Sequence, residues 1–116
     1  MTLTCIIVDI PKNLLYNYYM KTIKEVKQIL EKHKSIIEKQ YKVKEIGIFG
    51  SYVRGNQKNI SDIDILVEFY EPVGFFAFLD LEEYLSRLLN RKVDLVSKKA
   101  LKPRIGERIL QELIVI

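Results

Sequence analysis

The feature that most constrains the fold of this chain is a short apolar segment that ends in a Gly-Ser pair and is followed, after ten intervening residues, by an Asp-x-Asp pair. Residues 44–49 alternate in part between polar and apolar side chains and run into Gly50, which predicts a short strand ending in a tight turn. A helix is expected to begin at Ser51. Residues 61–69 first alternate and then become apolar, which predicts a second strand. The chain should therefore bring a strand–turn–helix unit close to a strand that carries two acids.

The turn at Gly50 and Ser51 is a candidate anion-binding site. The first turn of a helix has backbone N–H groups without intrahelical partners, and a glycine lets an anion approach the backbone closely. Ser51 adds a hydroxyl donor, and Arg54 lies one helical turn later on the same face with a planar fork of donors that fits phosphate oxygens. A Gly-Ser turn alone is common. The prediction that Gly50, Ser51 and Arg54 hold phosphate therefore depends on the acids that follow.

Asp62 and Asp64 are candidate metal ligands. Side chains two residues apart on a strand point to the same face, so the two carboxylates are presented together while the isoleucines on either side of Asp64 enter the core. Asp94 interrupts the short apolar run 92–96 and would join them if its strand lies beside theirs. Carboxylate oxygens suit Mg²⁺, and three acids can hold two such ions. The alternative is that each acid is a solvated residue on an exposed sheet face.

Together these segments resemble the signature of the DNA polymerase beta-like nucleotidyltransferase superfamily. The resemblance is carried by GSYVRG at residues 50–55, SDID at residues 61–64 and Asp94, in that order. More closely, the chain resembles the minimal nucleotidyltransferases that act as antitoxins beside HEPN-domain toxins. The resemblance covers residues 20–116 and implies an α/β (α+β) fold with a small mixed sheet flanked by helices. Residues 1–19 would be an N-terminal extension of open status, because Met20 could itself be a translation start.

The resemblance also implies a reaction, the transfer of AMP from ATP to a tyrosine hydroxyl of a cognate HEPN toxin. The toxin would form a hetero-oligomer with this chain, and the transfer would neutralise it. Asp62, Asp64 and Asp94 would be the catalytic and metal-binding residues, with two Mg²⁺ ions expected. Gly50, Ser51 and Arg54 would hold the triphosphate. Two alternatives stay open: an antitoxin that neutralises its partner by binding alone, and a nucleotidyltransferase that acts on a small molecule or RNA.

Length and charge limit the remaining possibilities. A chain of 116 residues forms one domain with one core. No apolar run approaches the roughly 18 residues that cross a membrane, so a cytoplasmic protein is expected. The net charge of +4 arises in residues 90–116, where seven basic residues face three acids. This segment could contact an acidic partner or remain solvated, and nucleic acid is an unlikely ligand because no aromatic residue is interleaved there.

The other segments predict three longer helices and several short strands. The helices are expected at residues 20–41, at 75–89 and from about Pro103 onward, and the strands at 92–96, at 114–116 as an edge strand and at 4–8 in the extension. Residues 55–61 should form a loop. The apolar residues expected to be buried on the last two helices are Phe75, Phe78, Leu79, Leu85, Leu88, Leu89, Ile105, Ile109, Leu110 and Leu113.

Overall fold

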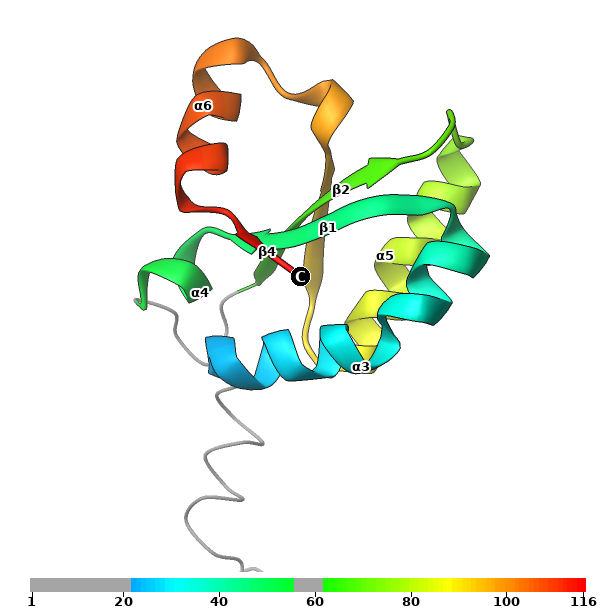
Figure 1. Ribbon diagram of the computed structural model, residues 1–116, viewed down its shortest axis with the longest axis horizontal. Coiled ribbons are helices and arrows are strands. Elements are labelled where there is room, and N and C mark those ends of the chain that lie inside the picture. The colour runs from blue at the N-terminus through cyan, green and yellow to red at the C-terminus, as the bar shows by residue number, and fades with distance from the viewer. Residues whose placement is uncertain (1–21, 56–61) are drawn as a thin grey trace, which may run out of the picture.

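The computed structural model describes residues 22–55 and 62–116 (Figure 1). Along the chain these residues form α3 (Ile23–Tyr41), β1 (Val43–Phe49), α4 (Ser51–Arg54), β2 (Ile63–Phe69), α5 (Phe75–Leu89), β3 (Val93–Ser97), the short 3₁₀ helix η1 (Lys98–Ala100), α6 (Pro103–Glu112) and β4 (Ile114–Val115). The predicted strand at 4–8, the extension 1–19 and most of the loop 55–61 lie outside the described residues. Within the described residues, the predicted helices and strands are confirmed in type and order.

The four strands form one mixed sheet in the order β3-β2-β1-β4. β1 runs antiparallel to both β2 and β4, whereas β2 and β3 are parallel. A parallel pair needs a long crossover connection, and α5 supplies it. The expected α/β (α+β) architecture with a small mixed sheet is therefore confirmed, as is the edge strand, in which Ile114 pairs with Ile48.

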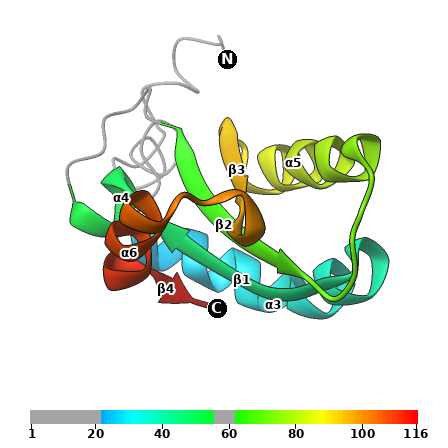
Figure 2. The same cartoon turned by 90° about the horizontal axis from the view of Figure 1, so that it is seen from above.

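Helices cover both faces of this sheet (Figure 2). On one face α3 packs against β1 and α5, and α5 also packs against β3. The main core between them consists of fully buried aliphatic side chains, among them Val26, Leu30, Ile37, Ile48, Ile63, Ile65, Leu81, Leu85 and Leu89. Leu66 follows Ile65 and so faces the other side, where it forms a smaller cluster with Phe49 and with Ile109 of α6.

Capping residues set the helix ends. α3 begins at Ile23 rather than near Met20, because the Thr22 hydroxyl caps it by accepting a hydrogen bond from the Glu25 N–H at 3.2 Å. Asn90 ends α5 in the left-handed conformation, with φ at 52°, as expected for a helix C-terminus. No helix in the described ranges is both long and apolar enough to span a bilayer.

Some predicted core positions are wrong. Phe75 is 69% exposed, and Leu79, Ile105 and Leu110 are between 37% and 54% exposed. Phe75 is the first residue of α5, and the buried side of this helix runs through Leu81, Leu85 and Leu89. Leu79 lies on another side, because residues two apart on a helix do not share a face. In α6 the buried residues are Gly106, which lies beside Leu101, and Ile109, which packs on Phe49 and Leu66 of the sheet. This second cluster is small, so Ile105 and Leu110 stay accessible to solvent.

Candidate active site

The turn between β1 and α4 requires a glycine. Gly50 has φ at 81° and ψ at −150°, a conformation that residues with a Cβ rarely adopt. A Cβ added to Gly50 would also collide with Oδ2 of Asp64. The backbone of the turn therefore lies directly against a carboxylate of β2, and the sequence can satisfy both requirements only with glycine.

Strand pairing brings two of the predicted acids to this turn. Phe49, the last residue of β1, is paired with Asp64, and Asp64 is in turn the register neighbour of Asp94 on β3. Paired residues in neighbouring strands point to the same face of a sheet. Asp64 and Asp94 alternate with fully or nearly fully buried aliphatic residues, so both project from the face that carries α6.

Asp62 stands just before β2, where its Oδ2 lies 3.9 Å from Nζ of Lys92. The three acids interact electrostatically. The pKa of Asp64 is raised to about 6, mainly by burial and further by repulsion from Asp94, Asp62 and Glu112, while the nearby Arg54 opposes the rise. A cation placed among these carboxylates would relieve the repulsion.

In this structure Asp62, Asp64 and Asp94 do not converge as a set of three metal ligands. Within residues 22–55 and 62–116, no group of three His, Cys, Asp or Glu side chains is arranged to hold a metal ion. Repulsion between charges acts over longer distances than ligand bonds do, so carboxylates can perturb one another without converging on a point. The donor chemistry fits Mg²⁺, which prefers oxygen ligands and usually completes its shell with water and phosphate. The assignment of Asp62, Asp64 and Asp94 as ligands stays a prediction.

Helix α4 has four residues, so its dipole is small and anion binding would depend on individual donors. Val53 and Arg54 donate their backbone N–H groups to the Gly50 carbonyl at 3.1 Å each. Ser51 opens the helix, where the first N–H groups have no intrahelical partner. The predicted donors Gly50, Ser51 and Arg54 are thus brought together at one turn, beside Asp64.

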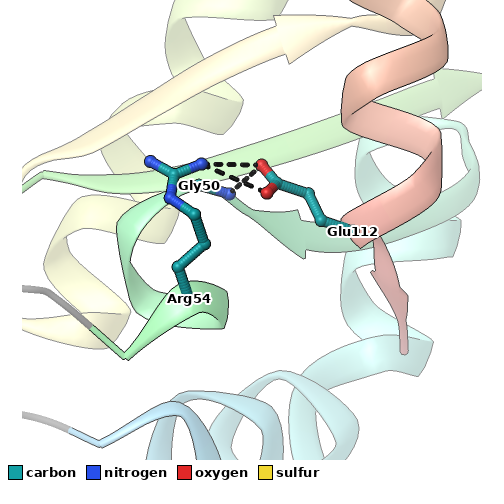
Figure 3. Close-up of polar contacts among 3 residues, drawn as sticks. All are labelled: Gly50, Arg54 and Glu112. Atoms are coloured by element: carbon teal, nitrogen blue, oxygen red, sulfur yellow. Dashed lines mark hydrogen bonds and ion pairs between the residues drawn. The ribbon is translucent and has the colours of Figure 1, made fainter.

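A residue that the sequence did not reveal joins this turn. Glu112, the last residue of α6, accepts a hydrogen bond from the Gly50 N–H at 2.9 Å (Figure 3). Both of its carboxylate oxygens also accept from Nη1 of Arg54 at 3.1 Å. Helical spacing places Glu112 three residues after Ile109 on the buried side of α6. An acid on the apolar face of an otherwise basic segment was the signal that could have identified it.

A hollow of about 220 Å³ lies between the turn and α6. The residues around it come from both sides, and they are Phe49, Gly50, Arg54, Asp64, Ile105, Arg108, Ile109 and Glu112. A larger hollow of about 420 Å³ lies at the opposite end of β2, around Pro72 and Phe78, away from the acids. Of these two hollows, the smaller one is lined by the predicted metal ligand Asp64 and by the predicted phosphate-binding residues Gly50 and Arg54.

Known proteins resemble this chain along nearly all of its described length. The protein adenylyltransferase MntA of Thermococcus cleftensis is 47% identical over 95 residues, which cover 82% of this chain and 96% of that protein. A solved structure described as a minimal nucleotidyltransferase matches with a TM-score of 0.71 at 30% identity, covering 82% of this chain and 96% of the other. A crystal structure of a toxin–antitoxin with AMP-PNP matches with a TM-score of 0.62 at 26% identity, covering 73% of this chain and 70% of the other.

The match to the minimal nucleotidyltransferase confirms the expected fold. Residues 30–116 also match the family model described as the nucleotidyltransferase domain, and this range contains every predicted site residue. The relative and the family model agree with the motif-based resemblance. The chain belongs to the nucleotidyltransferase domain family.

Proposed function

We propose that this chain is an Mg²⁺-dependent protein adenylyltransferase that transfers AMP from ATP to a tyrosine hydroxyl of a HEPN-domain toxin and so neutralises it. The observation that carries the proposal is the contact between Asp64 and the Gly50 turn, with Asp94 as the next residue across the sheet. Asp64 lines one hollow together with Gly50 and Arg54, which would hold phosphate. The adenylyltransferase name of the 47% identical relative and the AMP-PNP in the 26% identical toxin–antitoxin support ATP as donor and a toxin as acceptor.

In this reaction the acceptor hydroxyl oxygen bonds to the α-phosphorus of ATP, and the bond from that phosphorus to the bridging oxygen breaks. Pyrophosphate leaves with the electron pair of that bond, and the hydroxyl proton is transferred to a base. Asp94 is the most exposed of the three acids and suits the role of base, since an incoming hydroxyl can reach it. Asp62 and Asp64 would hold Mg²⁺, together with Asp94. When bound, Mg²⁺ would neutralise charge on the phosphates.

The turn would hold the departing pyrophosphate. Ser51 contributes its hydroxyl and backbone N–H, and Arg54 contributes its guanidinium. Donors that are in place before reaction stabilise negative charge as it develops on the leaving group. Gly50 lets these donors lie close to Asp64, so that one triphosphate can contact both sides of the hollow.

A hydroxyl presented by another protein fits this site better than a small molecule. The hollow beside Asp64 is small and open, whereas small-molecule sites enclose most of their ligand. The toxin would complete the enclosure from outside as part of a hetero-oligomer. Residues 20–116 would form the whole catalytic domain, and ATP as the donor favours a cytoplasmic location.

The test is the intact mass of the purified toxin after incubation with this protein, ATP and Mg²⁺. We expect the toxin to gain the mass of one or more AMP groups and to lose its activity. Asp62→Asn and Asp64→Asn should abolish the gain, while Asp80→Asn, a matched change on the exposed surface of α5, should not. A toxin neutralised without any change in mass would instead identify a binding antitoxin.

A further inference from the structure

We propose that Glu112 is a positioning residue of this site, which holds the Arg54 guanidinium and the Gly50 turn in place for the triphosphate of the nucleotide. The inference rests on the proposed function, in which this turn binds phosphate. Glu112 is 62 residues from Gly50 and 58 from Arg54 along the chain, yet a single carboxylate contacts both. The contact therefore ties the C-terminal end of α6 to the anion-binding turn.

This contact differs from the other ion pairs of the described residues. The Glu112 side chain is only 25% exposed, and its carboxylate serves a backbone N–H in addition to the guanidinium. Pairs such as Arg87 with Glu83 join two exposed side chains on one helix surface, where they contribute little to stability. Hydrogen bonds from a backbone N–H and a guanidinium to a carboxylate are charge-assisted and directional.

The position of Glu112 is fixed on both sides by packing. Ile109, one helical turn earlier, is buried against Phe49, the residue just before the turn. Ile114, two residues later, is paired with Ile48 in the sheet. The carboxylate is therefore held by the same strand whose end it contacts, so its contacts are built into the fold.

The geometry leaves the guanidinium able to bind a second anion. Both hydrogen bonds to Glu112 use Nη1 of Arg54. Within the described part of the chain, its Nε and Nη2 atoms donate to no other group. The Arg54 side chain is 51% exposed and would otherwise move freely in solvent. Holding it before the nucleotide arrives lowers the entropy lost when phosphate binds.

Glu112 also orients the glycine turn. The Gly50 N–H points to Glu112, while the position of a Gly50 Cβ would fall on Asp64. The turn thus lies between two acids: Glu112 contacts the N–H of Gly50, and Asp64 lies against its Cα. Loss of the Glu112 contact would let the turn move relative to Asp64. The distance between the phosphate donors and the carboxylates would then change as well.

The experiment measures the binding of AMP-PNP in the presence of Mg²⁺ by titration calorimetry. The variants are Glu112→Ala, which removes both contacts, and Glu112→Gln, whose amide oxygen can still accept from Gly50 N–H. Glu107→Gln is the matched control, because it removes one negative charge from an exposed position of the same helix. Thermal melting of each variant checks that it is folded, and Glu112→Gln carries the test if Glu112→Ala does not fold.

We expect Glu112→Ala to weaken AMP-PNP binding by about three- to tenfold, Glu112→Gln by less, and Glu107→Gln not at all. In an Arg54→Ala background, Glu112→Ala should cause a smaller further loss, because the residue acts mainly through Arg54. The KM for ATP should rise more than kcat falls, since the lost interaction supports binding of the triphosphate.

Two results would overturn the inference while leaving the proposed function intact. Unchanged affinity in both Glu112 variants would show that the contact serves stability alone. Tighter binding in Glu112→Ala would show that the carboxylate competes with phosphate for Arg54. If the wild-type protein itself bound no AMP-PNP, the proposed function would fail, and the inference would fail with it.

Discussion

Asp64→Asn should stabilise the metal-free protein near neutral pH, although it should abolish activity. The pKa of Asp64 is raised from 3.8 to about 6, first by burial and then by repulsion from Asp94 and Asp62. The folded state therefore binds the proton more tightly than the unfolded state does. The favourable contribution is fully present below pH 3.8 and is lost as the pH rises through about 6. Asparagine has nearly the same shape but no charge, so it avoids this loss.

The size of the effect follows from the shift. A rise of about two pKa units corresponds to at most about 3 kcal/mol. The Asp64 side chain is partly exposed, so solvent screens the repulsion and about 1 kcal/mol is a more realistic gain. For a domain of this size, about 1 kcal/mol corresponds to a rise in Tm of roughly 4 °C.

The assay is thermal unfolding in a chelating buffer at pH 8 and at pH 5. Asp64→Asn should melt above the wild type at pH 8, and the difference should become smaller at pH 5. Added Mg²⁺ should raise the Tm of the wild type more than that of Asp64→Asn. Asp80→Asn is the control for loss of one exposed carboxylate. If Asp64→Asn melts at or below the wild-type Tm at pH 8, burial and like-charge repulsion do not destabilise the ionised Asp64 in the way the raised pKa requires.

Glycine substitutions test the geometry of the turn, with Gly55→Ala as the control for Gly50→Ala, and separately the packing of α6. Gly50→Ala should destabilise the fold by about 2 kcal/mol or more in urea unfolding, since it adds both a strained φ and a collision with Asp64, and should abolish nucleotide binding. Gly55→Ala has a similar φ of 77°, but among the described residues no atom lies within 4 Å of the added Cβ, so it should lose only about 1 kcal/mol; equal losses in the two variants would refute the close contact with Asp64. Gly106→Ala should stabilise the protein by about 0.5–1 kcal/mol, because within residues 22–55 and 62–116 the added methyl group meets only Leu101, at ordinary contact distance, and alanine favours the helix; a lower Tm would contradict this.

The elements that sequence reasoning predicted best are those with a strict pattern. The alternation around Asp64 and the Val-Asp-Leu run around Asp94 fixed which side chains face outward, and the register of β2 and β3 then placed the two acids together. The Gly-Ser pair similarly marked the strand-to-helix turn. Each of these features depends on local backbone preference or on a period of two residues, which the sequence displays directly.

Features that depend on tertiary placement were missed. Glu112 contacts a turn about 60 residues away, and the packing of Ile109 on Phe49 together with the pairing of β4 with β1 brings it there. Phe75 and Ile105 are exposed, because helical periodicity shows which side chains share a face but not whether another element covers that face. The metal site at Asp62, Asp64 and Asp94 stays a prediction, since within the described residues no three such side chains are arranged as ligands.

The role of the basic C-terminal segment, residues 90–116, as a surface for an acidic partner stays a prediction. Its lysines make only long or exposed contacts, such as Lys98 with Glu68 at 3.9 Å and Lys92 with Asp62 at 3.9 Å. Such pairs contribute little to folding, so these charges are available to an acidic partner. Because Lys92 lies beside Asp62, a partner bound there would approach the proposed active site.

The most direct measurement of the central claim follows each phosphate of ATP separately. The toxin would be incubated with this protein, Mg²⁺ and ATP labelled either at the α-phosphorus or at the γ-phosphorus, and then denatured. Our account predicts that α-label stays covalently on the toxin, that γ-label does not, and that Asp64→Asn transfers neither. Retention of γ-label, or a neutralised toxin that carries no label, would contradict it.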